Sequence, residues 1–204
     1  VMRAITAKFD PYVQVHSRLR ALELNGHAID KIELIIMGGT FSCLPKPYQK
    51  NFIKECFRAC NDYPQKYKSL SSKVQESEKK LIKDKKKNEK FKCRVIGITL
   101  ETRPDYIDEK EIINFRRLGC TRVELGVQSI FDDVLVVNKR GHGVKETIRA
   151  TKLLKDAGFK INYHMMPGLP GSDSKKDMEM FRKIFSDPSY RPDMLKIYPT
   201  VVVK

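Results

Sequence analysis

The sequence lacks the features that direct a chain to a membrane or to the secretory route. It has no signal peptide, and no apolar run is long enough to cross a bilayer. Its five cysteines form neither an even set nor a disulfide framework, which favours reduced thiols. We therefore expect a cytoplasmic protein that does not associate with membranes.

The sequence also lacks the residue patterns of common hydrolases and dinucleotide-binding enzymes. No Ser/His/Asp arrangement and no paired carboxylates stand out, which counts against plain hydrolysis. No Gly-x-Gly-x-x-Gly fingerprint follows a predicted strand. Cys56 and Cys60 lie four residues apart, but they fall on the apolar stripe of a predicted helix. We interpret both as core residues and assign no metal ligand in this chain.

Acidic residues are scarce relative to basic ones. The chain has 25 Asp and Glu against 40 Lys and Arg, a formal net charge of +15 that favours a polyanionic partner, RNA or DNA before membrane. Residues 64–92 form a Lys-rich helical or loop segment with eleven lysines and four acidic residues. We expect Lys83, Lys85, Lys86 and Lys87 to contact nucleic acid. A solvated basic helix is the alternative interpretation.

What is present is a repeated alternation of strand and helix patterns. Apolar runs near residues 122 and 161 flank an amphipathic stretch at 144–157, which predicts a βαβ unit with parallel strands. Further strands are expected near residues 32, 95 and 194. Helices are expected after Asp10, over residues 46–60, 71–87 and 108–118, and around Met178, Phe181 and Phe185. This order predicts an α/β fold, a partial (β/α) TIM-like barrel with its site at the C-terminal rim, with a doubly wound open sheet as the alternative.

Each predicted strand is followed by glycine, proline or polar residues. These offer hydrogen-bond donors, acceptors and open backbone but no obvious nucleophile, so the set suits a polar, zwitterionic cofactor that brings its own reactivity. In chain order they are Gly38, Gly39 and Thr40, then Glu101 and Arg103, Gln128 and Ser129, Arg140 and His142, His164, and finally Lys196 and Tyr198.

Six segments around these residues resemble the radical S-adenosylmethionine (radical SAM) enzymes. More narrowly, they resemble the family of Elongator catalytic subunits, of archaeal type, which modify the wobble uridine of tRNA. The segments are Met37-Gly-Gly-Thr40, Glu101-Thr-Arg-Pro-Asp105, Glu124-Leu-Gly-Val-Gln-Ser129, Asn138-Lys-Arg-Gly-His142, His164-Met-Met-Pro-Gly-Leu-Pro170 and Leu195-Lys-Ile-Tyr-Pro199. The resemblance covers essentially the whole chain.

The resemblance implies a cofactor site and a substrate side. S-adenosylmethionine would be bound by Gly38, Gly39, Thr40, Glu101, Gln128, Ser129, Arg140 and His164. Lys196 and Tyr198 would be catalytic residues that face acetyl-coenzyme A and the uridine. A 4Fe–4S cluster is also implied, but the five cysteines of this chain include no close trio to bind it.

The resemblance further implies that residues 1–204 are a fragment of a radical SAM domain. The cluster-binding segment would lie upstream and an acetyltransferase domain downstream, so the fragment alone is expected to be inactive. The longer protein would add a carboxymethyl or acetyl group from acetyl-coenzyme A to C5 of the tRNA wobble uridine. It would act alone, as a homo-oligomer or in an Elongator-type assembly. Two alternatives are a radical SAM enzyme acting on a small molecule such as a porphyrinogen, and a non-enzymatic RNA-binding scaffold.

Overall fold

The computed structural model describes residues 2–65 and 78–201. The chain divides into two compact units, Val1–Gly38 with Leu44–Ile98 and Gly39–Cys43 with Thr99–Lys204. Its elements in chain order are α1 (Met2–Thr6), α2 (Pro11–Leu24), β1 (Lys31–Ile36), η1 (Phe41–Cys43), α3 (Lys46–Asp62), α4 (Glu78–Asn88), β2 (Arg94–Thr102), η2 (Pro104–Tyr106), α5 (Glu109–Leu118), β3 (Arg122–Gln128), α6 (Asp132–Val137), α7 (Val144–Asp156), β4 (Lys160–Met165), α8 (Ser174–Ser186) and β5 (Met194–Ile197).

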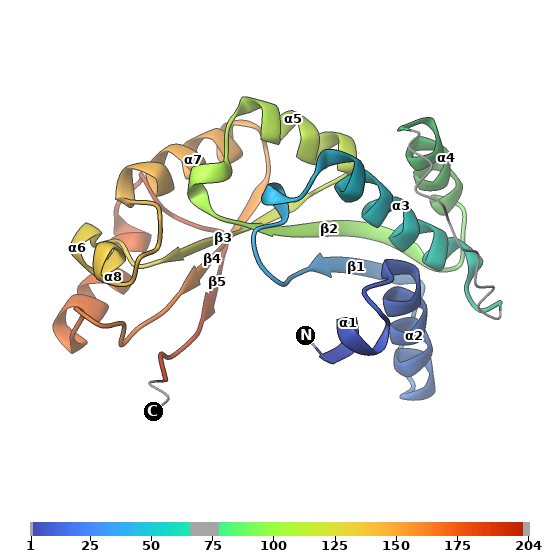
Figure 1. Ribbon diagram of the computed structural model, residues 1–204, viewed down its shortest axis with the longest axis horizontal. Coiled ribbons are helices and arrows are strands. Elements are labelled where there is room, and N and C mark those ends of the chain that lie inside the picture. The colour runs from blue at the N-terminus through green and yellow to red at the C-terminus, as the bar shows by residue number, and fades with distance from the viewer. Residues whose placement is uncertain (1, 66–77, 202–204) are drawn as a thin grey trace. The chain divides into compact units, whose positions relative to one another are not determined.

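The strands follow one another through the sheet in chain order, β1-β2-β3-β4-β5 (Figure 1). β2, β3, β4 and β5 are parallel to their neighbours. This order confirms the five predicted strands and the βαβ unit formed by β3, α7 and β4. Within the described ranges, none of the helices is both long and apolar enough to cross a bilayer.

The first unit packs its helices around a small apolar core. The carboxylate of Asp10 accepts a hydrogen bond from the Val13 N–H at 3.1 Å, which starts α2 where the sequence predicted. Leu19, Cys60 and Cys93 pack in one buried cluster. Cys60 and Cys56 are thus core residues, as predicted. The helix expected over residues 71–87 is observed as α4, and residues 66–77 lie outside the described part of the chain.

The second unit covers one side of its strands with α5 and α7 (Figure 1). Asp108 caps the start of α5 through the Glu111 N–H at 2.7 Å, and Gly119, with φ of 91°, ends it. A hydrogen bond between the hydroxyls of Thr151 and Tyr163 joins α7 to β4. This contact identifies the face of the sheet on which Tyr163 lies as the helix-covered one.

The strands of the second unit divide their side chains into an apolar and a polar face. Partners in a parallel ladder point to the same side, and successive residues alternate. Glu101, Glu124 and Asn162 are such partners, and His164 lies beside Lys196. The helix-covered face instead carries fully buried apolar residues, namely Leu100, Val123, Leu125, Ile161 and Tyr163. The polar side chains of four strands are therefore gathered on the opposite face, which we call the polar face.

Three local features differ from the expectations. The short helices α1 and α6 were not anticipated, because five and six residues are too few to establish a periodic pattern. In α8, Met180 and Ile184 are buried, whereas Met178 and Phe185 are 54% and 57% exposed. Since α8 carries apolar residues on two sides, periodicity alone did not identify its packed face.

Replacing Cys56 with Ser should destabilise the fold. The side chain is 2% exposed, and its burial raises the pKa of the thiol, as expected for an apolar position. Burying a hydroxyl there should cost about 1–3 kcal/mol of unfolding free energy, measurable by urea titration. Cys43→Ser, at an exposed cysteine, is the control and should change stability by less than about 0.5 kcal/mol. Equal effects of the two substitutions would contradict the core assignment.

Candidate active site

A buried carboxylate lies at the centre of the polar face. Glu124, in the middle of β3, is 1% exposed. It accepts hydrogen bonds from His164 Nε2 at 2.7 Å, Lys196 Nζ at 2.7 Å and Asn162 Nδ2 at 3.2 Å. Because these donors come from β4 and β5, a single carboxylate connects three adjacent strands.

The environment of Glu124 keeps it ionised. Burial by itself raises the pKa of the carboxyl, but the hydrogen bonds from His164 and Lys196 outweigh that effect and lower the pKa to about 2. A carboxylate can only accept hydrogen bonds, so His164 Nε2 must donate in this contact. The buried charge therefore fixes which ring nitrogen of His164 carries the hydrogen.

Two of the predicted site residues, Glu101 and Tyr198, lie next to the His164 ring as well. Nδ1 lies 3.6 Å from Glu101 Oε1. The ring of Tyr198 meets that of His164 edge-on, with 5.3 Å between their centroids. Together with Lys196, these residues form one group, although the sequence placed them on three separate strands.

Gln128 ends β3 in a strained conformation. Its φ is +68°, in the left-handed region, and the pairing of β3 with β4 shifts register between Leu125 and Gln128. Such bulges redirect side chains and are common beside functional sites. The Gln128 amide lies over Gly126, with Nε2 3.3 Å from the Cβ that an alanine would have there. Its Oε1 is buried and has no hydrogen-bond partner among the described residues.

Arg140 reaches the same place from the loop after α6. Its Nη2 lies 3.7 Å from the position of a Cβ on Gly126. Burial, and secondly the nearby Arg103, lower the pKa of its guanidinium. Arg103 is itself paired with Asp105 by two hydrogen bonds of 2.9 and 2.5 Å. Arg140 Nε has no partner within the described ranges, so this guanidinium offers an unused donor to an anionic group, whereas Gln128 Oε1 offers an unused acceptor to a hydrogen-bond donor of a ligand.

The glycine turn after β1 has open backbone. Gly38 and Gly39 have φ of +129° and +121°, and a Cβ at either would meet no atom within 4 Å. Gly39 and Thr40 belong to the second unit, whereas Gly38 falls in the first. The turn is held to β2 by a 2.9 Å hydrogen bond from Thr102 Oγ1 to Ser42 Oγ.

Ser129 and His142 serve the local backbone. Ser129 Oγ accepts a 3.3 Å hydrogen bond from the Phe131 N–H. His142 Nε2 lies 3.4 Å from the Val127 carbonyl oxygen, and burial lowers the pKa of this imidazole. The first contact stabilises the turn after β3, and the second holds the loop after α6, which carries Arg140, to the Val127 carbonyl of β3. A cofactor contact by Ser129 stays a prediction.

The cysteines are not arranged to hold a cluster. Cys43 is exposed and the other four are buried, and burial raises the pKa of the Cys60 and Cys120 thiols to about 12. Among the described residues, no group of three His, Cys, Asp or Glu side chains is placed to bind a metal. The residues that the structure describes thus fit a polar cofactor but not an iron–sulfur cluster.

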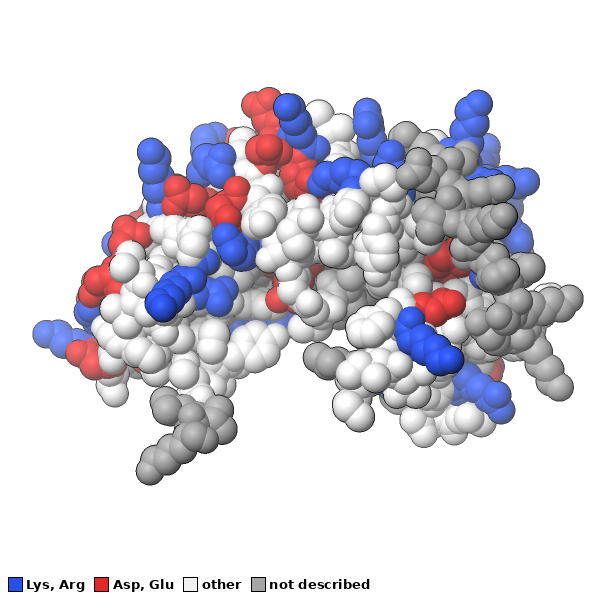
Figure 2. All heavy atoms as spheres, viewed as in Figure 1, with Lys and Arg blue, Asp and Glu red and all other residues white. Residues whose placement is uncertain are grey.

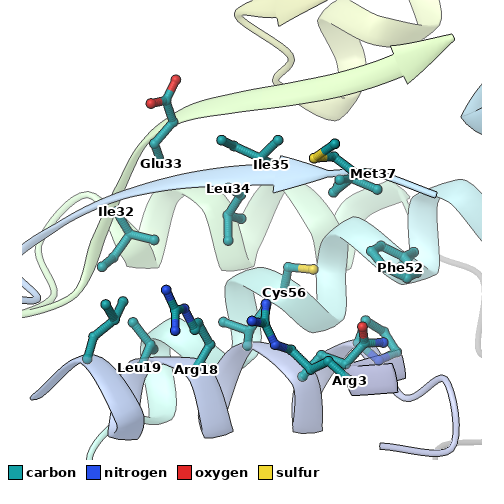
Figure 3. A pocket seen from close by; sticks show the side chains of 15 residues that line it. Arg3, Arg18, Leu19, Ile32, Glu33, Leu34, Ile35, Met37, Phe52 and Cys56 are labelled. Carbon is teal, nitrogen blue, oxygen red and sulfur yellow. The ribbon is translucent and has the colours of Figure 1, made fainter. Parts of the chain in front are cut away.

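The first unit has a separate groove of about 480 Å³. Figure 3 shows Ile32 and Leu34 pointing from β1 toward α2, while Glu33 and Ile35 point to the other side of the strand. Cys56 also lines the groove. None of the predicted cofactor-binding or catalytic residues lies in it, so it is not part of the candidate site.

The predicted nucleic-acid contacts lie on α4 in the first unit. Lys83, Lys86 and Lys87 are exposed, whereas Lys85 is half-buried and burial lowers its pKa. Figure 2 shows Lys and Arg side chains spread over the visible face and mixed with acidic ones, with several projecting where Figure 1 labels α4. Three of the four lysines are therefore available to phosphates.

Sequence reasoning missed Glu124, Asn162 and Gly126 as site residues. A signal for Glu124 was present, because an acidic residue interrupts an otherwise apolar strand and a buried charge must be paired. Its alternation with Gly126 also indicated that these two residues share a face. Asn162 gave no such signal, since its role depends on its register partner across the sheet.

Comparison with known proteins identifies the family of the chain and several relatives. Residues 10–184 match the Radical SAM superfamily. The chain is 49% identical over 203 residues to a tRNA uridine(34) acetyltransferase of Methanocaldococcus infernus, covering 100% of this chain and 36% of that protein. It is 42% identical to the human Elongator complex protein 3, again over 100% of this chain and 35% of the relative. The chain thus spans about a third of the length of these curated relatives.

Solved structures support the fold assignment. The archaeal Methanocaldococcus infernus Elp3 with an N-terminal deletion superposes with a TM-score of 0.88 at 49% identity, covering 98% of this chain and 44% of that one. Coproporphyrinogen III oxidase from Escherichia coli superposes with a TM-score of 0.51 at 13% identity, covering 85% of this chain and 44% of that one, which shows a shared fold alone. The chain has the α/β fold of a partial radical SAM barrel, as the sequence predicted.

The depressed pKa of Glu124 should make stability depend on pH. Because the folded pKa of about 2 lies below the usual value for Glu, Glu124 contributes stability above about pH 4.3 that is lost as pH falls toward 2. The contribution is on the order of 3 kcal/mol at neutral pH. Urea titrations from pH 7 to pH 3 should show a smaller loss of stability in Glu124→Gln than in the wild type. Glu109→Gln, at an exposed residue, should keep the wild-type slope; identical slopes for all three proteins would contradict the assignment.

Proposed function

The chain belongs to the radical SAM superfamily, and we propose that it is the part of a tRNA wobble-uridine-modifying enzyme that binds S-adenosylmethionine and presents the uridine to it. The observation that supports this proposal most strongly is that Gln128 and Arg140, both with unused buried polar atoms, meet over Gly126. The strands of the same unit also carry the Glu101–His164–Lys196–Tyr198 group. The printed names of the relatives, tRNA uridine(34) acetyltransferase and Elongator complex protein 3, support the substrate.

The family implies S-adenosylmethionine and a 4Fe–4S cluster as cofactors, which together supply a carbon-centred radical. In our proposal, the Arg140 guanidinium pairs with the carboxylate of the methionyl group, because it is desolvated and has unused donors. Gln128 and Glu101 bind further polar groups, and the open turn at Gly39 and Thr40 receives the methionyl amino end. The described residues supply no cluster ligands, so those belong to another part of the protein.

Lys196 and Tyr198 define the substrate side in this proposal. Lys196 lies in β5 and Tyr198 directly follows it, and both are partly exposed, with Tyr198 40% exposed. The Lys196 ammonium would contact acetyl-coenzyme A or the uridine, and the Tyr198 ring offers a surface against which a base stacks. The uridine must leave its anticodon stack to reach this position. We further propose that the enzyme acts within an Elongator-type assembly or as a homo-oligomer.

Removing the side chains of Gln128 and Arg140, the two proposed cofactor contacts, should abolish the activity. In the full-length protein, Gln128→Ala combined with Arg140→Ala should weaken S-adenosylmethionine binding by at least about 100-fold, since each lost contact to a charged group is worth about 1.5–3 kcal/mol. Calorimetry and mass spectrometry of modified tRNA would measure binding and activity. Arg182→Ala, at an exposed arginine of α8, is the matched control. Full tRNA modification by the double variant would exclude the proposed site.

Neutralising the exposed lysines of α4 should weaken tRNA binding. Each phosphate contact contributes about 0.7–0.9 to the slope of log K against log salt, so changing Lys83, Lys86 and Lys87 to Gln should reduce the slope by about 2–3. Changing Lys145, Lys175 and Lys183 to Gln removes the same charge from exposed positions in α7 and α8 and should leave the slope nearly unchanged. Filter binding over a salt series measures both. If both triple variants had the same slope, the α4 lysines would not contact tRNA phosphates, and α4 would be a solvated basic helix.

A further inference from the structure

Glu124 differs from the other site residues because it contacts both halves of the proposed site. His164, on the cofactor side, donates Nε2–H to it, and Lys196, on the substrate side, donates from Nζ. We propose that Glu124 is a positioning residue that couples cofactor binding to turnover by fixing His164 and Lys196 in one arrangement. The proposal rests on the proposed function for the roles of those two residues.

The carboxylate is held so that it cannot reorient. Asn162, its register partner on β4, donates to Oε1 at 3.2 Å, while His164 bonds to Oε2 at 2.7 Å. Lys196 Nζ lies 2.7 Å from both oxygens. Both oxygens are therefore engaged by donors on two further strands. Movement of either His164 or Lys196 would leave a buried charge short of a donor, which is unfavourable.

The contact geometry also sets where His164 points. Since Nε2 is bound to Glu124, Nδ1 is directed to the side of Glu101, at 3.6 Å. The ring edge then meets Tyr198. Glu124 thus determines the orientation of the His164 imidazole. In the proposed site, that imidazole would contact both a cofactor group bound by Glu101 and a substrate beside Tyr198. Positioning of this kind raises rates because misplacement of about 1 Å costs up to about 100-fold.

The same sheet contains a second carboxylate, Asp193, whose role is purely structural and which serves as a control. Asp193 joins the opposite ends of β4 and β5, accepting from the Ile161 N–H at 2.9 Å and from Lys160 Nζ at 2.8 Å. It carries the same charge as Glu124 and bridges neighbouring strands. In the described part of the chain, however, Glu124 bonds to side chains of the polar face, whereas Asp193 bonds to backbone and an exposed lysine.

The test compares Glu124→Gln with Asp193→Asn in the full-length protein. Glu124→Gln should lower Tm and, at a temperature where the variant is still folded, weaken S-adenosylmethionine binding and lower the kcat of tRNA modification, each by about 10- to 100-fold. Asp193→Asn should lower Tm and leave binding and kcat within about twofold. Equal losses in both variants, or an unchanged Glu124→Gln enzyme, would overturn the proposal.

A double-mutant cycle keeps the proposal testable if Glu124→Gln does not fold. His164→Gln and Lys196→Gln each remove one of the three donors of Glu124 and leave the other two in place. If Glu124 couples the two residues, the effect of the double variant on kcat should differ from the product of the two single effects by at least about fivefold. A simple product would overturn the coupling. Failure of the proposed function is distinguishable: a wild-type protein that modifies no tRNA would exclude that function, while S-adenosylmethionine affinity would still decide whether Glu124 positions His164.

Discussion

The need to neutralise one buried charge constrains the second unit. Moving a carboxylate from water into a protein interior costs several kcal/mol unless donors replace its hydration. At Glu124 these donors are side chains from β4 and β5. The strands must therefore keep the register that places Asn162 and His164 within reach. The interaction that satisfies the charge also assembles the residues proposed to act on cofactor and substrate.

The division of the sheet into two faces makes this arrangement compatible with a stable fold. The apolar face packs against α7 and provides the hydrophobic stabilisation of the unit. The polar face can therefore carry polar and charged side chains without loss of that stabilisation. Polar side chains of β2 to β5 can then meet at one place without interrupting the core. The Arg140 loop adds a cation that no strand supplies, because a guanidinium at the end of a loop can approach the rim from outside.

Much of the fold could be predicted from local sequence patterns. Apolar runs located the strands, and Asp108 and Gly119 located the limits of α5, because these signals act within a few residues. The contacts around Glu124 could not be derived, since they depend on register between strands that are distant in sequence. The position of the Gln128 side chain also escaped prediction, because simple alternation does not anticipate a bulge. In α8 two apolar stripes competed, and the packed one was decided by tertiary contacts.

The left-handed backbone at Gln128 has a consequence for protein engineering. Glycine adopts positive φ without the steric cost that other residues bear, about 1–2 kcal/mol for a residue with a side chain. A search that ranks substitutions by folding stability would therefore favour Gln128→Gly. Such a variant would be more thermostable but would lack the amide that we propose binds the cofactor. At this position, selection for heat resistance and selection for catalysis favour different amino acids.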